Sequence, residues 1–259
     1  MSHLDNLHLH WRTGQGYLDT LVKKGSARLI GEPTLSIVRD TGTSTATVTP
    51  APICIYNAPQ KGSSTRRGVS HRLAIFVGGG FKLHVKDEPF LLNGKCYLSI
   101  YDCQDEKRKF AKLKLRDAMH FDMESDQLNE RTPFHPIFHA QRGRSNDLTI
   151  DTIKDLVHAH THAPREAIEI EDDTALGSPY LRLPTPQLDF FSVLTVIAAD
   201  YFCNPGDTSA TAKNSFKAML DWLTDKRNVA SPSRAERAMM ETCKKRSSFS
   251  TAWWYPESA

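Results

Sequence analysis

Three imidazoles and a carboxylate lie close together in the middle of the sequence, at His120, Asp122, His135 and His139. His120 and Asp122 are two positions apart, so on a β-strand their side chains project from the same face. His135 and His139 are four positions apart, which suits one face of a short helix or turn. Neutral imidazole together with a carboxylate binds zinc, manganese or iron. The pattern therefore predicts a divalent-metal site formed by these four residues.

The same four side chains have two other interpretations. They could act as general acids and bases on a phosphodiester, with Arg142 or Arg144 stabilising the anionic transition state. They could equally form a structural network, because histidines often close hydrogen-bond networks at loop corners and the sequence contains no His-Glu-x-x-His motif. The metal-binding, catalytic and structural interpretations all remain open at this point.

A longer pattern surrounds these residues. It runs from His120-Phe121-Asp122 through His135-Pro136-x-x-His139-x-Gln141 to residues 181–186, Leu-Arg-Leu-Pro-Thr-Pro, which lead into an apolar helix. This pattern, within residues 70–205, resembles a group of uncharacterised bacterial proteins found on mobile elements near defence or toxin–antitoxin genes. The resemblance implies an accessory protein of such a system, and it assigns no role to any residue.

A second group of histidines, His158, His160 and His162, falls at the end of a predicted helix. His158 and His162 would share a helix face, whereas His160 would not. Charged histidines near a helix C-terminus also interact favourably with the helix dipole. We interpret the group as histidines at a helix end that have no ligand role. The alternative is a metal site shared with His135 or His139.

Basic residues gather in a predicted loop and at a predicted turn between strands. Lysine and arginine in such places neutralise phosphates, which makes them a candidate nucleic-acid-binding surface. No named nucleic-acid-binding motif is present and charged hairpin tips are common, so a solvated surface is the alternative. The candidate residues are Arg66, Arg67, Arg72, Lys107, Arg108 and Lys109.

The three consecutive glycines Gly78-Gly79-Gly80 do not fit a phosphate-binding loop, which needs a strand before it and a helix after it. Here Phe81, Leu83 and Val85 alternate with polar residues and predict a following strand. We therefore predict a hairpin turn at the glycines and a second one at Asn93-Gly94.

The elements that must position these residues change in type along the chain. Residues 5–24 predict a helix, and the period-2 pattern of residues 69–121 predicts an antiparallel meander. Further helices are predicted at about 150–163, 188–202, 212–225 and 233–246. This order predicts the α+β class, with a curved antiparallel sheet, an N-terminal helix and a C-terminal helical segment. We expect residues 1–145 and 146–259 to form one composite domain.

The net charge of +3 conceals an uneven distribution along the chain. Residues 1–118 carry 18 Lys and Arg against 10 Asp and Glu, a net charge of +8, whereas residues 119–207 carry 6 against 15, a net charge of −9. The basic segment suits a polyanion, and the acidic segment suits a cation or a basic partner. The alternative is that both sets of charges are spread over solvated faces.

The composition, 39% hydrophobic and 24% charged among 259 residues, is typical of a globular protein. No apolar run approaches the roughly 18 residues of a membrane span, and the N-terminal residues lack the layout of a secretory signal. Five widely spaced cysteines, without zinc-ribbon or thioredoxin spacing, are expected to be buried in a reducing compartment. We expect a cytoplasmic protein without membrane contact.

No cofactor fingerprint or nucleophilic-hydrolase motif points to one activity. Our leading hypothesis is an interaction or adaptor component of a bacterial multi-protein system of the defence or toxin–antitoxin type, with a protein partner and contact with nucleic acid. The alternative is a metal-dependent nuclease or phosphoesterase that uses the His/Asp cluster, with Arg142 as anion stabiliser. A sequence-independent nucleic-acid binder is the third hypothesis. The candidate cofactor is a divalent metal.

Overall fold

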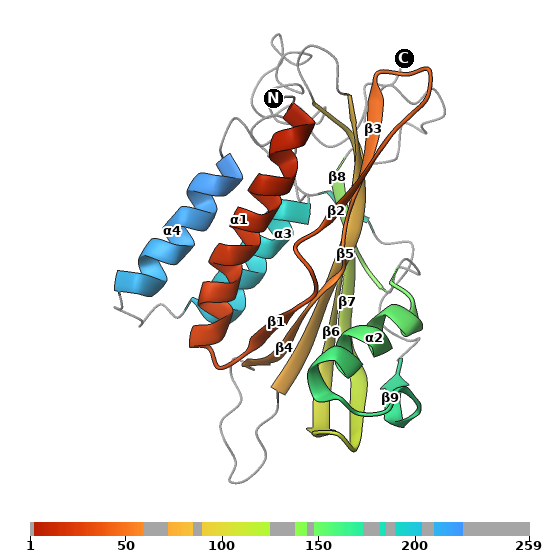
Figure 1. Cartoon of the computed structure of the whole chain (residues 1–259), viewed down its shortest axis with the longest axis vertical. Coiled ribbons are helices and arrows are strands. Elements are labelled where there is room, and N and C mark those ends of the chain that lie inside the picture. The colour runs from red at the N-terminus through yellow and green to blue at the C-terminus, as the bar shows by residue number, and fades with distance from the viewer. Residues whose placement is uncertain are drawn as a thin grey trace.

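In the computed structural model, one large sheet forms the centre of the protein and helices cover parts of both its faces (Figure 1). The α+β class predicted from the sequence is confirmed. The structure describes residues 3–59, 72–84, 90–124, 138–143, 148–172, 182–184, 190–203 and 210–224.

Three long antiparallel strands form the middle of the sheet: β5 (Arg72–His84), β6 (Phe90–Glu106) and β7 (Phe110–Glu124). Successive side chains point to opposite faces, so the buried apolar run Leu73–Val77 of β5 contributes to the cores on both faces of the sheet. The turn that joins β6 to β7 contains residues 107–109, where the basic run predicted a turn.

Strand β5 has two neighbours in succession along its outer side. Its first half pairs with β4 (Ile53–Pro59) and its second half with β3 (Thr45–Pro50). β1 (Arg28–Ile30) pairs with β4, and β2 (Leu35–Arg39) pairs with β3. We call the end of the sheet that contains β4 the lower half and the end that contains β3 the upper half, as they lie in Figure 1.

Strand β7 likewise changes its neighbour along its length. In the lower half it pairs in parallel with β9 (Ile168–Glu171), and in the upper half it pairs antiparallel with β8 (Phe138–Arg142). β10 (Arg182–Pro184) pairs with β8. The sheet is therefore antiparallel throughout its described part except at β9.

The three glycines lie inside β5, so the predicted hairpin turn at Gly78–Gly80 is wrong. They fall where β5 changes partner, since Val77 pairs with β4 and Phe81 pairs with β3. Gly79 has φ +152°, and a Cβ there would overlap the Lys95 carbonyl oxygen of β6. Glycine is needed at this position for backbone conformation and close approach within a strand.

The turn predicted at Asn93-Gly94 is also wrong, because both residues lie inside β6. Asn93 pairs with Lys82 on one side and with Glu124 on the other. Strand pairing on both sides has therefore overridden a strong local turn preference.

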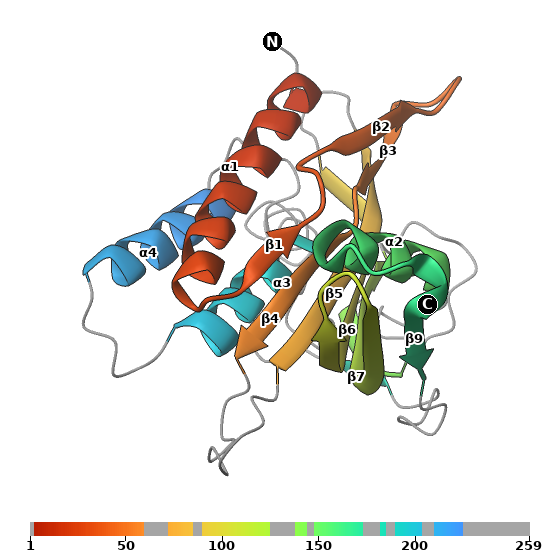
Figure 2. The same cartoon turned by 60° about the horizontal axis from the view of Figure 1, so that its bottom comes forward.

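One face of the sheet is covered by α1 (His3–Lys24), α3 (Phe190–Ile197) and α4 (Ala210–Thr224), as Figures 1 and 2 show. The chain continues from α3 through a π-helical turn, Ala198–Phe202. The helices predicted at 5–24, 188–202 and 212–225 are confirmed over the described residues of these ranges. Their apolar sides bury a core against the sheet, and its helical members include Trp11, Leu18, Leu194 and Trp222.

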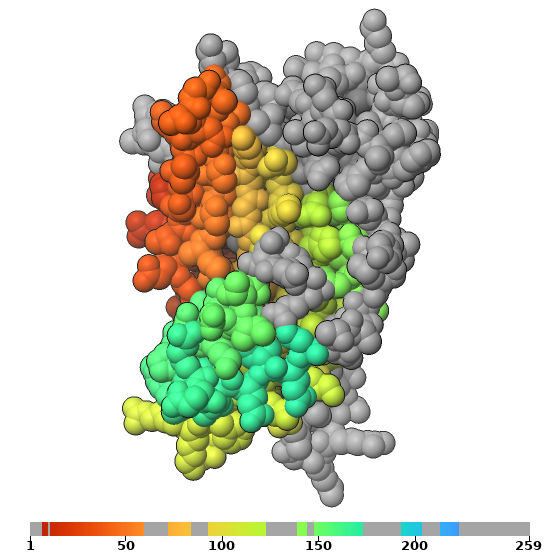
Figure 3. All heavy atoms as spheres, turned by 90° about the vertical axis from the view of Figure 1, so that its right-hand side faces the viewer, coloured from red at the N-terminus to blue at the C-terminus, as the bar shows by residue number. Residues whose placement is uncertain are grey.

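The opposite face carries a second, smaller core in its lower half. There α2 (Ile150–Thr161) packs Ile153 and Val157 against the sheet side chains Tyr101 and Leu113. The Thr149 side chain caps this helix by accepting a hydrogen bond from the Thr152 backbone N–H. Figure 3 looks onto this face, which we call the α2 face, with α2 below and β3, β5 and β6 above it.

Other predictions have mixed outcomes. Cys54, Cys96 and Cys103 are buried, as expected, whereas Cys203 is only partly buried and Cys243 lies outside the described residues. The helix predicted at 233–246 lies outside the described residues, and the boundary at residue 145 stays a prediction. No helix in the described part of the chain is both long and apolar enough to cross a membrane.

Two glycines in α1 give a matched test of the helix packing. A Cβ at Gly14 would overlap the indole ring of Trp222 on α4, whereas a Cβ at Gly16 would have nothing within 4 Å. We expect Gly14→Ala to lower the free energy of unfolding by about 1–3 kcal/mol because the two helices must separate. Gly16→Ala should raise it by roughly 0.5–1 kcal/mol through helix propensity. Urea titration followed by tryptophan fluorescence measures both, and equal effects would contradict this packing.

Candidate functional site

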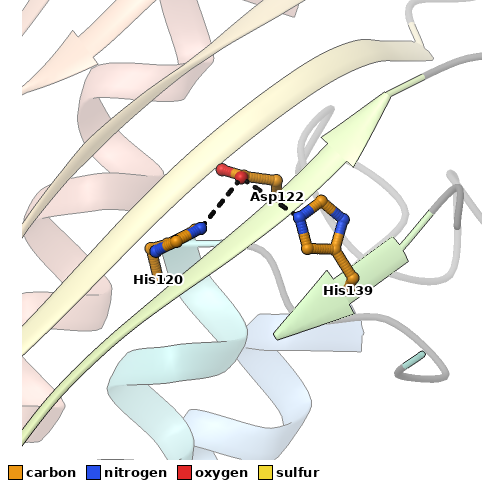
Figure 4. A group of neighbouring side chains, drawn as sticks. All are labelled: His120, Asp122 and His139. Atoms are coloured by element: carbon orange, nitrogen blue, oxygen red, sulfur yellow. Dashed lines mark ion pairs between the residues drawn. The ribbon is translucent and has the colours of Figure 1, made fainter. Parts of the chain in front are cut away.

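His120, Asp122 and His139 come together on the α2 face of the upper half (Figure 4). Asp122 on β7 lies directly opposite His139 on β8 in the strand register. The intervening residues Phe121 and Ala140 point the other way, into the core beneath α1 and α3. Strand alternation therefore places all three polar side chains on one face.

One carboxylate oxygen lies between the two imidazoles. Asp122 Oδ2 is 3.4 Å from His120 Nε2 and 3.4 Å from His139 Nε2. The side chains are only 16%, 20% and 2% exposed for His120, Asp122 and His139 respectively. Both separations exceed the 2.7–3.2 Å of an ordinary nitrogen–oxygen hydrogen bond.

These separations suit a metal ion. Ligand atoms about 2.1 Å from a tetrahedral zinc ion lie about 3.4 Å from one another. One ligand atom from each of the three side chains lies within 4.8 Å of both others, so one ion can reach all three after small rotations. Two imidazoles and one carboxylate leave at least one coordination position free for water or substrate.

Gln141 is a neighbour of the cluster to which the sequence assigned no role. It is buried, lies opposite His120 in the register, and places Oε1 3.1 Å from His120 Nε2. His120 Nδ1 is buried and has no hydrogen-bond partner among the described residues. The amide oxygen can only accept, so His120 Nε2 carries the hydrogen in this contact and must give the contact up in order to bind a metal ion.

Asp122 is held as a carboxylate. Burial alone would raise its pKa, but the polar contact with His139 and the positive charges of His120, His139 and Lys95 outweigh burial and lower the pKa. An ionised carboxylate is the form that binds a cation, so the site needs no deprotonation of Asp122 at neutral pH.

Asp122 also lines a pocket of about 400 Å³ on the α2 face, between β3 and β7. Lys82 on β5 and Lys95 on β6 supply its basic groups, and Thr47 and Thr49 on β3 supply hydroxyls. None of these four residues was predicted as a site residue. Their period-2 spacing on strands indicated only a solvent-facing side, and the strand order that gathers them could not be read locally.

Arg142, predicted to stabilise an anion beside the cluster, does not join it. Its Nε donates to Asp117 Oδ1 at 3.0 Å, and its side chain is 56% exposed. Arg142 pairs with Met119 in the register, and Met119 packs against the core on the other face. Residues 139 and 142 differ by an odd number of strand residues, so their side chains project from opposite faces of the sheet.

The other predicted site residues lie elsewhere. His135, Arg66 and Arg67 are outside the described residues. Arg72 begins β5 at the lower end of the sheet, where it pairs with Cys103 beside the basic β6–β7 turn. Cys103 is eight residues from Lys95 along β6, so Arg72 lies about 26 Å of strand away from Lys95. In that turn Lys107, Arg108 and Lys109 are exposed, and Lys109 pairs with Glu106.

The histidines of α2 have separate contacts. His158 Nδ1 donates to the Ala163 carbonyl at 2.7 Å, and the His160 ring lies 4.5 Å from the ring of Tyr56. His162 caps the helix in the left-handed conformation, with φ 56°. Among the described residues, the only metal-ligand cluster is the one on β7 and β8. These contacts support the interpretation as a helix end.

Comparison with known proteins adds no assignment. No protein-family model, no curated protein and no solved structure matches the chain. The resemblance to bacterial accessory proteins therefore stays a prediction, and the functional argument depends on the geometry of the site.

His160 gives a test of its structural role. Burial, reinforced by the charge of Arg28, lowers the pKa of His160 below its ordinary 6.5. The unfolded chain therefore binds a proton first as the pH falls, so stability is full above about pH 6.5 and declines between that pH and the lowered pKa. His160→Phe keeps a ring against Tyr56 and should remove this part of the pH dependence. His8→Phe on the exposed side of α1 is the control.

Urea unfolding at about pH 7.5 and about pH 5.5 measures the effect on both sides of the ordinary histidine pKa. An unchanged loss of stability in the His160 variant would show that other groups cause it.

Proposed function

We propose that His120, Asp122 and His139 bind one divalent transition-metal ion, and that the protein uses this ion to hydrolyse a phosphate ester. The observation that carries the proposal is the position of Asp122 Oδ2, 3.4 Å from the Nε2 atom of each histidine in a largely buried cluster. Such spacing is that of a coordination sphere rather than of paired hydrogen bonds.

The pocket beside the cluster supports hydrolysis of an anion. A metal ion there would lower the pKa of a bound water towards neutrality and polarise a phosphoryl oxygen. Asp122 belongs both to the cluster and to the pocket wall, so a ligand in the pocket would lie next to the ion. Lys95 adds a positive charge on the same wall.

The second candidate is the adaptor function in a bacterial defence or toxin–antitoxin system, in the cytoplasm and with a protein partner. The observation that favours it is the edge of β2, which pairs only with β3 in the described part of the sheet. Val38 on this strand is 59% exposed. An edge strand with an apolar side chain can accept a strand from another protein.

Metal binding tests the proposed site directly. Protein purified without a histidine tag and titrated with zinc or manganese should bind one equivalent. Mutation of a residue that hydrogen-bonds to a metal ligand lowers metal affinity roughly 10–100-fold. Loss of a ligand itself should lower the affinity by at least as much. We therefore expect Asp122→Asn and His139→Ala to lose the metal and His8→Ala, which removes an exposed imidazole on α1, to keep it. Calorimetry and elemental analysis provide the readout, and absence of metal in wild type would favour the adaptor function.

Hydrolysis tests the chemistry. With metal present, wild type should hydrolyse p-nitrophenyl phosphate or its bis(p-nitrophenyl) diester, and His139→Ala should reduce the rate to background. Arg142→Ala should stay close to wild type because its guanidinium pairs with Asp117 on the opposite face. Release of nitrophenol is the measurement. A metal-loaded protein that hydrolyses neither ester would restrict the site to metal binding.

A further inference from the structure

The pocket contains two lysines in different electrostatic situations. Lys82 Nζ lies 2.8 Å from Asp40 Oδ2, and Asp40 also accepts a hydrogen bond from Thr45 at 2.6 Å. Lys95 is exposed and lies directly across from Asp122 in the pairing of β6 with β7. Each lysine therefore faces one carboxylate, and the four groups together carry no net charge.

A divalent ion changes this balance. When the ion binds beside Asp122, its two positive charges bring the net charge of the four groups and the ion to +2, with neutral histidines. Asp122 is then engaged by the metal and no longer neutralises Lys95. A dianion would restore neutrality, and the Thr47 and Thr49 hydroxyls on the facing strand can donate hydrogen bonds to its oxygens.

We propose, on the basis of the metal site proposed above, that this pocket binds the dianionic phosphate of a small phosphomonoester, with Lys95 as a direct contact and only when the metal is present. A phosphomonoester carries about two negative charges at neutral pH, whereas a phosphodiester carries one. The pocket volume of about 400 Å³ is that of a small-molecule site, the size of a mononucleotide rather than of a duplex.

The backbone supports close approach of a ligand to the pocket floor. Gly79 and Gly80 on β5 and Gly94 on β6 form part of the pocket lining, and Gly80 pairs with Lys95. With no Cβ, these residues leave the pocket floor open next to Lys95. A larger residue at Gly80 would press on the Val48 carbonyl, since its Cβ would lie 3.2 Å from that oxygen.

The experiment measures phosphate binding separately from metal binding. Inorganic phosphate and adenosine monophosphate are titrated calorimetrically into metal-free and metal-loaded wild type, Lys95→Gln and Lys114→Gln. Lys114 is an exposed lysine on β7 outside the pocket and serves as the matched control. We expect binding only to metal-loaded protein, about 10-fold or more weaker in Lys95→Gln and unchanged in Lys114→Gln, because a hydrogen bond to a charged group is lost. Lys95→Gln should still bind one metal ion.

Each other outcome is decisive. Metal binding without phosphate binding, or equal phosphate affinity in Lys95→Gln and wild type, would overturn this inference and leave the metal site intact. Phosphate binding that does not need the metal would overturn the charge argument. Displacement of adenosine monophosphate by duplex DNA at equal phosphate concentration would assign the pocket to nucleic acid. Failure of wild type to bind any metal would overturn the proposed function and this inference together.

Discussion

The pairing of β5, β6 and β7 is the constraint on which the rest of the structure depends. These strands have 13, 17 and 15 residues, long enough to run through both halves of the sheet. Their lower ends form one wall of the core under α2, and their other face forms the floor of the core under α1, α3 and α4. The upper end of β7 holds His120 and Asp122. The rigidity of the candidate site is therefore that of the central sheet, and no loop is needed to position these two side chains.

Strand alternation explains both what was predictable and what was not. His120 and Asp122 were expected on one face because they are two apart, and that geometry is local. The position of His139 depends on the register of β8 against β7, which no local pattern specifies. The spacing of His135 and His139 favoured a helix or turn, so the odd spacing between His139 and Arg142 was not recognised as a change of face. The turns predicted at Gly78–Gly80 and Asn93-Gly94 were wrong because pairing with neighbouring strands holds both segments in an extended conformation.

The charge segregation in the sequence is partly cancelled in the fold. Lys112, from the basic segment, lies 2.5 Å from Glu171 and 3.9 Å from Glu169 of the acidic segment across the parallel β7–β9 pair. Arg142 and Asp117 similarly join the two segments. These pairs are exposed and contribute little stability individually, but they reduce the long-range field that a simple count of charges implies. The local balance around Asp122 is a better guide to binding than the net charge of either segment.

The contact between Gly14 and Trp222 joins two helices about 200 residues apart in the chain. At roughly 5–20 residues per second, a ribosome needs on the order of 10–40 s to make the residues between them. During that time the side of α1 that α4 will cover has no partner, so its final packing must follow synthesis of the later helix. Close contact without a side chain at residue 14 lets α4 dock late, onto a helix and sheet that have already formed. The order of synthesis thus makes α4 the last of the described elements to dock, and a nascent chain stalled before it would present an incomplete core to chaperones.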